Sequence, residues 1–255
     1  MEYIFEKVPK NYEDFASGRV LYNAQGTTSF PVRLASELFQ RAKSYLKAKG
    51  AGGQYTVYDP CCGGAFLLTT LGLLHGGDLS QLVGSDIDDK VLELAAKNLF
   101  LINADGMEAR IDQIHKMILE YGKDSHKQAL ESALLLKKQI VQRNSTLMYN
   151  YFQADATDSK HRLKPKSVDL VITDVPYGDM VQWKSEDDSD HPIEKLLEHL
   201  YEMLKPTSII CIVADKKQKI SNIRYKRLDR FKVGKRQVAF LEPIIGGHMD
   251  SAKTS

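Results

Sequence analysis

Apolar positions along the chain switch between two spacings, and this alternation predicts an α/β fold. Short apolar or β-branched runs predict strands over 55–58, 82–86, 149–155, 168–173 and 208–214. Apolar residues at helical spacing predict helices over 31–49, 65–75, 89–102 and 192–204. Uninterrupted apolar runs suit strands that are covered on both faces, so we expect a doubly wound, mostly parallel sheet.

Two segments depart from this alternation. Between 107 and 142 the pattern predicts two consecutive helices joined near 122–125, which we interpret as a helical hairpin inserted before the third strand. Further on, 231–233 and 237–241 flank a turn at Gly234 and predict an antiparallel pair. Together with the five earlier strands this pair predicts a seven-stranded, Rossmann-like sheet.

The two ends of the chain carry weaker signals. Residues 1–50 are interpreted as an irregular lead-in, with a short strand over 19–22, followed by the first helix. The tail over 243–255 carries Gly and Ser, and we expect it to be disordered. The prediction is one domain over 1–255.

Composition narrows the class of protein. The chain has 255 residues, is 43% hydrophobic and lacks an apolar run of about 18 residues, so it is expected to be soluble and monomeric. Its first residues, MEYIFEKVPK, carry acids rather than a basic and then apolar leader, which favours a cytoplasmic protein. Cys61, Cys62 and Cys211 have neither CxxC spacing nor a nearby His pattern, so no metal site is predicted.

Positive charge is concentrated in one segment. The net charge is only +2, but 216–236 holds ten Lys or Arg residues against the single acid Asp229. This density predicts a surface that contacts RNA phosphates, with six residues as candidates: Lys216, Lys217, Lys219, Arg224, Lys226 and Arg227. A solvated hairpin is the alternative. The inserted helices also carry outer charges, Arg110 and Lys116 among them, and are interpreted either as an RNA-contacting appendage or as a packing lid.

Acidic residues stand at the ends of four predicted strands, at Asp59, Asp86, Asp155 and Asp174. The carboxyl ends of parallel strands share one edge of the sheet, so these carboxylates are expected to converge near the point where strand order reverses. The turn at Gly63 and Gly64 would let backbone approach a ligand closely, and Asp86 stands where a ribose-binding acid would. Each acid alone could be a helix cap or a turn residue.

The negative charge of these acids distinguishes between two classes of nucleotide-like ligand. A dinucleotide is disfavoured because GxGxxG is absent and a pyrophosphate would lie beside Asp59 without a compensating cation. A sulfonium with a free amino group would favour such an acid. We therefore predict S-adenosyl-L-methionine, with Asp59 at its amino-acid end, Asp86 on the ribose and Asp155 on the adenine amine. The predicted binding set is Asp59, Cys61, Gly63, Gly64, Asp86, Ile87, Asp155, Ala156 and Asp174.

The segment VITDVPYG over 171–178 is the candidate catalytic motif. Pro176 cannot donate to a ladder, so the strand ends before it and the motif lies in a turn. Asp174 and the Val175 carbonyl could accept two hydrogens from an exocyclic amine, while Tyr177 could stack on a base. We predict Asp174, Pro176 and Tyr177 as catalytic residues, and Tyr177 as an RNA contact. A capping Asp with a half-buried Tyr is the alternative.

These motifs carry a resemblance. DPCCGG at 59–64, SDID at 85–88 and TDVPYG at 173–178 resemble class I S-adenosylmethionine-dependent methyltransferases that act on exocyclic amines of nucleic-acid bases. The longer strings FPVRLASELFQRA, DPCCGGAFLLTTLGLLH and LELAAKNL resemble the avilamycin-resistance family of rRNA methyltransferases. The resemblance implies methylation of a guanine in large-subunit (23S) ribosomal RNA, a role in rRNA processing, and resistance to orthosomycins such as avilamycin.

Two departures and three rival functions keep the interpretation open. Val175 replaces the Pro common in amine methyltransferases, and Cys61, Cys62 and Ala65 replace glycines. The first departure leaves the target nitrogen open. The rivals are a nucleotide-dependent oxidoreductase, an amine methyltransferase for tRNA or DNA, and a non-catalytic RNA-binding protein with the same fold.

Overall fold

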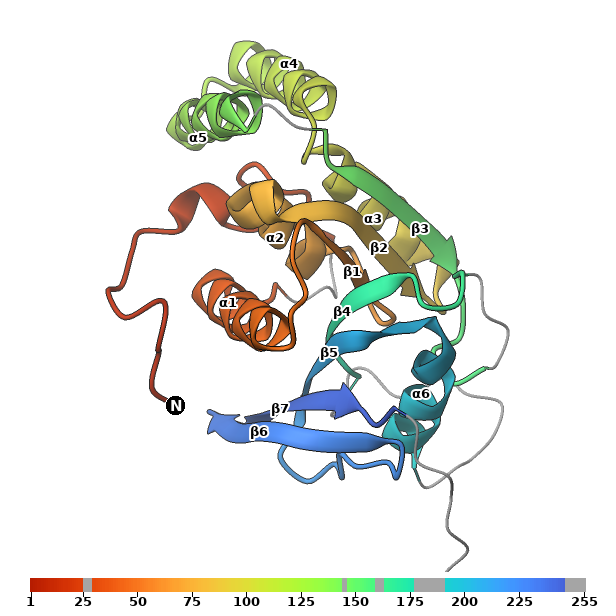
Figure 1. Cartoon of the computed structure of the whole chain (residues 1–255). Coiled ribbons are helices and arrows are strands. Elements are labelled where there is room, and N and C mark those ends of the chain that lie inside the picture. Colours follow the sequence, from red (N-terminus) through yellow and green to blue (C-terminus); the bar gives the residue numbers. More distant parts are fainter. Residues whose placement is uncertain (25–28, 144–145, 159–162, 177–190, 246–255) are drawn as a thin grey trace, which may run out of the picture.

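The computed structural model describes residues 1–24, 29–143, 146–158, 163–176 and 191–245. Within them, one seven-stranded sheet has the order β3-β2-β1-β4-β5-β7-β6 (Figure 1). The strands are β1 (Tyr55–Asp59), β2 (Leu79–Asp86), β3 (Met148–Gln153), β4 (Val168–Asp174), β5 (Leu204–Asp215), β6 (Tyr225–Val233) and β7 (Arg236–Pro243). Strands β1 to β5 pair in parallel, whereas β7 runs antiparallel to both β5 and β6. The predicted doubly wound, mostly parallel sheet is confirmed.

Helices cover both faces of the sheet. They are α1 (Val32–Ala48), α2 (Phe66–His75), α3 (Asp89–Phe100), α4 (Ala104–Tyr121), α5 (Asp124–Gln142) and α6 (Pro192–Leu200), with short 3-10 turns at Glu13–Phe15, Gly76–Asp78 and Tyr201–Met203. In Figure 1, α1 and α2 lie on one side of the sheet and α6 on the other. The sheet separates two hydrophobic cores: a first core on the side of α1, α2 and α3, and a second core on the side of α6. Leu170 of β4 packs in the first core and its neighbour Val171 in the second. Every residue of β4 except its last, Asp174, is buried, and the run Leu170–Ile172 is apolar throughout, as a strand covered on both faces requires.

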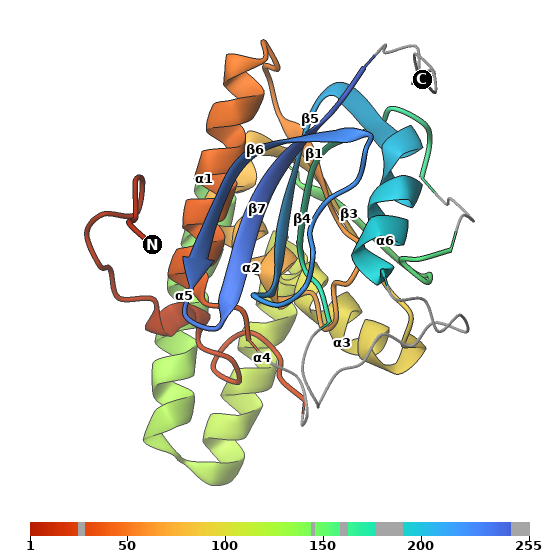
Figure 2. The same ribbon diagram turned by 90° about the horizontal axis from the view of Figure 1, so that it is seen from below.

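The helical hairpin is present, but it packs on the N-terminal lead-in and not as a lid over one face of the sheet. Figure 2 shows α4 and α5 side by side, projecting away from the sheet. Their apolar face forms a third core with the lead-in, including Leu21, Ile111 and Leu136. Arg110, expected on an outer face, is buried, and its Nε donates to the Val20 carbonyl at 2.9 Å. The hairpin therefore supports the N-terminal segment.

The lead-in departs from the sequence prediction. No strand forms over 19–22; instead Gly18, with φ 82°, begins a turn in which its amide donates to the Leu21 carbonyl at 2.9 Å. A left-handed residue at this point breaks the extended backbone that a strand needs. Other differences concern boundaries, since β2 begins at Leu79 and β6 at Tyr225, earlier than predicted. Most of the predicted disordered tail, 246–255, lies outside the described residues.

One buried carboxylate holds the start of the chain in place. Glu37 on α1 is 0% exposed, and it accepts backbone hydrogen bonds from Ile4, Phe5 and Glu6 at 2.8, 2.9 and 2.8 Å. Arg41, one turn later, donates to it at 2.7 Å. Burial alone would raise the pKa of Glu37, but these donors together bring it below its ordinary value. The charged form is thus fully solvated by protein groups.

None of the described helices is long and apolar enough to cross a membrane.

The Glu37 contacts generate a first prediction. Glu37→Gln keeps the shape but replaces one acceptor oxygen with an amide group, so at least one of the three backbone donors loses its partner. We expect faster hydrogen exchange at Ile4, Phe5 and Glu6 and a loss of roughly 1–3 kcal/mol in the free energy of unfolding. Glu93→Gln on the exposed side of α3 is the matched control. Unchanged exchange at those three amides would show that Glu37 does not hold them.

Candidate functional site

Four acids lie around the carboxyl ends of the parallel strands. Asp59 ends β1 opposite Gly84, and Asp86 ends β2 opposite Gln153. Asp174 ends β4, on the other side of β1, where strand order reverses. Asp155 follows the last residue of β3 by two positions. The chain thus places these acids at the edge where open α/β sheets bind their ligands.

Electrostatic coupling shows that the acids are close to one another. The charges of Asp86 and Asp174 both raise the pKa of Asp59. The Cys61 thiol, whose pKa burial raises well above its ordinary value, is also affected by Asp59, Asp86 and Asp155. All four carboxylates therefore lie near the end of β1 and the turn that follows it.

Asp59 is the most deeply buried of the four, at 2% exposed. One of its oxygens accepts the Cys61 amide at 3.1 Å. Burial, with smaller contributions from Asp86 and Asp174, raises its pKa from 3.8 to about 7, although the Thr173 hydroxyl and the Cys61 amide oppose the shift. A carboxylate in this position favours a cationic ligand, because a positive charge would offset both burial and repulsion.

Asp86 fixes the turn over 61–65. Its Oδ2 accepts the Gly63 amide at 2.8 Å and its Oδ1 the Asp88 amide at 3.1 Å. Gly63 has φ 51°, and a Cβ there would meet no atom within 4 Å, so this part of the backbone faces open space. At Gly64 a Cβ would lie 2.6 Å from a methyl of Leu94, because the turn packs directly on α3. The turn is thus tightly held on one side and open on the other.

Asn98 is a site-supporting residue that the sequence analysis missed. It is buried on α3, and its Nδ2 donates to the Gly64 carbonyl at 2.8 Å and to the Tyr22 carbonyl at 3.1 Å. Its Oδ1 accepts the Tyr22 amide at 2.8 Å. An Asn on the apolar side of LELAAKNL was the available signal, since a buried amide needs such partners.

The side chains expected near an adenine lie between β2 and β3. Ile87 is 36% exposed although apolar, and its carbonyl accepts the Gln153 side chain at 3.0 Å. Asp155 Oδ1 accepts both the amide and the hydroxyl of Thr157 at 2.7 Å, so this acid also fixes its own turn. Ala156 packs partly against the second core.

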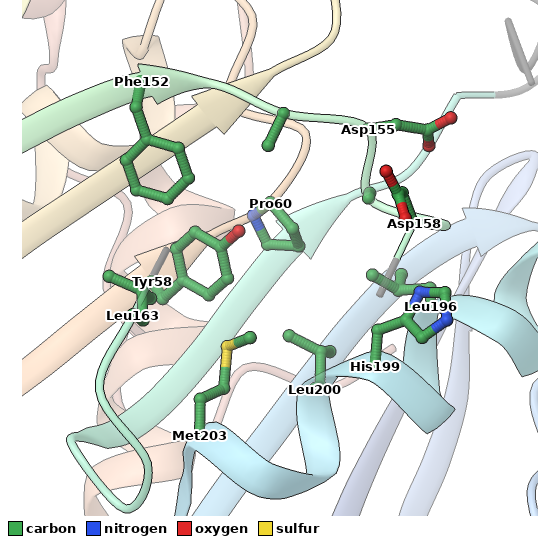
Figure 3. A pocket seen from close by; sticks show the side chains of 12 residues that line it. Tyr58, Pro60, Phe152, Asp155, Asp158, Leu163, Leu196, His199, Leu200 and Met203 are labelled. Atoms are coloured by element: carbon green, nitrogen blue, oxygen red, sulfur yellow. The ribbon is translucent and has the colours of Figure 1, made fainter. Parts of the chain in front are cut away.

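A small cavity lies beside the segment Asp155–Asp158 that follows β3 (Figure 3). Tyr58, Phe152 and Leu163 line one side, and Leu196, His199 and Leu200 line the other. Its volume of about 20 Å³ suits roughly one water molecule, too little for an adenine ring. A base held by Ile87 and Ala156 would therefore lie outside this cavity.

Asp174 has a partner that the sequence analysis did not single out. Arg236, the first residue of β7, places Nη2 3.5 Å from Asp174 Oδ2, with side chains 23% and 22% exposed. The following turn is held by the Val175 amide, which donates to Val213, and by Gln218, which donates to the Pro176 carbonyl at 3.3 Å. Pro176 thus stays beside Asp174, while Tyr177 lies outside the described residues.

The six basic candidates divide into two groups. Lys216, Lys217 and Lys219 follow the end of β5, at the same edge as Asp174. Tyr225 pairs with Pro243 at the opposite end of the antiparallel strands. That end holds Arg224, Lys226 and Arg227, roughly 20 Å away along β6. Arg224 and Lys226 are moreover paired with Glu198 and Glu242 at 3.0 and 3.5 Å. The structure brings only the first group to the site.

The charged groups at this edge of the sheet indicate which ligands it can bind. Among the described residues, four acids with one guanidinium beside Asp174 disfavour a phosphate but suit an ammonium or sulfonium group and ribose hydroxyls. The open backbone at Gly63 and the exposed Ile87 provide contact surface for such a ligand. Among the described residues no cluster of His, Cys, Asp or Glu could hold a metal ion.

Comparison with known proteins identifies close relatives. A family model described as rRNA methyltransferase AviRa matches residues 1–236. The 23S rRNA (guanine(2535)-N(1))-methyltransferase of Streptomyces viridochromogenes is 37% identical over 231 residues, 89% of this chain and 90% of that protein. The 1.5 Å structure of rRNA methyltransferase AviRa from the same organism has a TM-score of 0.83 and 34% identity, covering 95% of this chain and 96% of that chain.

A more distant structure shares the fold alone. TrmN from Thermus thermophilus matches with a TM-score of 0.50 and 17% identity, covering 85% of this chain and 50% of that chain.

The raised pKa of Asp59 predicts an effect on stability. The folded-state value of about 7 lies above the ordinary 3.8, so folding takes up a proton between these values and the cost of ionised Asp59 grows as pH rises. Asp59→Asn removes that cost and can still accept the Cys61 amide. We expect a free energy of unfolding higher by roughly 2–4 kcal/mol at pH 8, and by less than about half as much at pH 5. Urea unfolding at the two pH values measures the difference.

The control is Asp112→Asn, at an exposed position of α4, which should change stability little at either pH. A gain in Asp59→Asn that is the same at pH 5 and pH 8 would contradict a raised pKa as its cause.

Proposed function

The chain belongs to the AviRa family of rRNA methyltransferases, and we propose that it methylates N1 of a guanine in 23S rRNA. As a class I methyltransferase, it uses S-adenosylmethionine as its cofactor. The observation that carries the proposal is 37% identity, over 89% of the chain, to a protein whose name states this reaction. The corresponding guanine, 2535 in that name, is the proposed target.

The proposed atom differs from the one expected from the sequence. TDVPYG favoured an exocyclic amine, but the relative's name gives N1, a ring nitrogen, so the comparisons do not support the amine. The difference changes the chemistry. An amine nitrogen can attack first and lose its proton afterwards, whereas guanine N1 carries a proton and needs a group that removes it. Resistance to avilamycin stays a prediction.

The residues at the sheet edge fit the cofactor. When bound, S-adenosylmethionine supplies an electrophilic methyl group on a positively charged sulfur. Asp59 would favour the cationic amino-acid end, for which its burial beside other acids is suited. The backbone of Cys61, Gly63 and Gly64 would lie along the same end, and Asp86, held by two amides, would bind ribose hydroxyls.

The adenine end of the cofactor would lie between β2 and β3. Ile87 and Ala156 would contact the faces of the base, and the exposed apolar surface of Ile87 supports this placement. Asp155 would accept the adenine amine with the carboxylate that also holds the Thr157 turn.

Asp174 would face the substrate. Its carboxylate is the group best placed to accept the N1 proton, because the strand end and the Gln218 contact to Pro176 fix the turn on either side. Tyr177, outside the described residues, remains the proposed stacking partner of the flipped base. Lys216, Lys217 and Lys219 would contact RNA phosphates next to the site.

The product distinguishes the two nitrogens. We expect the purified protein to convert a 23S rRNA fragment that contains the target guanine to 1-methylguanosine, identified by mass spectrometry of nucleosides against standards. Asp174→Asn should lower the single-turnover rate by about 10²–10⁴-fold, because the proton acceptor is lost, and leave S-adenosylhomocysteine affinity within a few-fold. Asp105→Asn, exposed at the start of α4, is the control.

A fragment with inosine at the target position sharpens the test. Inosine keeps the N1 proton and O6 but lacks the exocyclic amine, so methylation should persist. N2-methylguanosine as the product, or complete loss of transfer to inosine, would refute the N1 assignment.

A further inference from the structure

We propose that Arg236 is a further catalytic residue, which binds O6 of the target guanine and stabilises the negative charge that develops there as N1 loses its proton. The inference rests on the proposed function, because only attack by N1 places this charge on the base.

The geometry places a cation beside the proposed proton acceptor. Arg236 Nη2 lies 3.5 Å from Asp174 Oδ2, and both side chains are about three-quarters buried. A base bound at this edge would therefore meet the guanidinium and the carboxylate together.

Several contacts fix the position of Arg236. In the antiparallel register it lies opposite Asp215, the last residue of β5. Its guanidinium carbon lies 5.5 Å from the ring centre of Phe30, just before α1. The next residue, Gln237, is 0% exposed and donates to the carbonyls of Asp215 and Gln218. The side chain therefore starts from a rigid part of the sheet, as a catalytic donor should.

The reaction at N1 needs such a donor. In neutral guanine the N1 electron pair is delocalised and the N–H is only weakly acidic, while a carboxylate such as Asp174 is a weak base. When the N1–H bond breaks, the proton passes to Asp174 and the electron pair is shared between N1 and O6. N1 then forms a bond to the methyl carbon as the carbon–sulfur bond breaks, and the sulfur keeps that pair as a neutral thioether. A guanidinium at O6 lowers the energy of the charge that precedes this bond.

The same pair also recognises the base. N1–H and O6 are neighbouring groups on one edge of guanine, a donor next to an acceptor. Asp174 and Arg236 present the complementary acceptor and donor side by side. Adenine shows the opposite order on that edge, with an acceptor at N1 and a donor at the amine, so it would meet two mismatches. Arg236 thereby contributes to selection of guanine as well as to rate.

The test is the pH dependence of the chemical step. Single-turnover methyl transfer to the 23S rRNA fragment is measured from pH 6.5 to 9.5 at saturating S-adenosylmethionine for wild type, Arg236→Gln and Arg236→Lys. At pH 7 we expect Arg236→Gln to be about 10²–10³-fold slower, the usual effect of removing one donor to a developing oxyanion. The ratio of the wild-type rate to the Arg236→Gln rate should fall at least tenfold by pH 9.5, because guanine N1 then loses its proton without stabilisation by a guanidinium. The rate of Arg236→Lys, which keeps the positive charge, should lie between those of wild type and Arg236→Gln.

Binding measurements exclude a merely structural role. Affinities of Arg236→Gln for S-adenosylhomocysteine and for the unmethylated fragment should stay within about threefold of wild type, and Lys47→Gln, an exposed charge near the end of α1, should match wild type throughout. A rate deficit that is equal at every pH, or no deficit, would overturn the role of Arg236. Failure of the wild type to form 1-methylguanosine would instead overturn the proposed function.

Discussion

The candidate site depends on one buried carboxylate, Asp59, whose charged form is disfavoured both by burial and by neighbouring acids. Asp59 lies at the end of β1, almost inaccessible, with two further acids close enough to raise its pKa. The neighbouring acids are each restrained differently, Asp86 by two backbone amides and Asp174 by Arg236. Similar residues at one edge thereby acquire distinct surroundings: one is buried beside like charges, one holds the backbone turn, and one lies beside a guanidinium. Proteins commonly accept such local costs at functional sites.

The parts of the chain outside the sheet are mechanically connected to this edge. The α4–α5 hairpin buries part of the lead-in, and the lead-in is connected to the turn over 61–65 through Asn98, which bonds both Tyr22 and Gly64. At its other end the lead-in is held on α1 by Glu37. The insertion therefore has a structural role in supporting the site, and any contact it makes with RNA would come in addition to that role.

Much of this arrangement could be predicted from local sequence. Acids at the ends of apolar runs placed Asp59, Asp86 and Asp174 at one edge because parallel strands impose it. Arg236 and Gln218 were not singled out, because their contacts to Asp174 and Pro176 depend on the antiparallel register of β7 and on the turn after β5. The same register places Arg224, Lys226 and Arg227 at the end of β6 that is far from the site. A cluster of basic residues in the sequence does not reveal this separation. The exocyclic amine expected from the sequence is not supported by the relative's name, and sequence alone does not separate the two atoms because an Asp before a turn suits either an amine or N1.

Proton release on ligand binding shows whether Asp59 holds a proton in the free protein below pH 7 and loses it when a ligand with an ammonium group binds. Calorimetry of S-adenosylhomocysteine binding at pH 6.5, in buffers of different ionisation enthalpy, counts the protons exchanged. With a free-state pKa of about 7, we expect release of about three-quarters of a proton per ligand at pH 6.5, and almost none at pH 8.5. Binding without proton release at pH 6.5, or release that persists in Asp59→Asn, would contradict it.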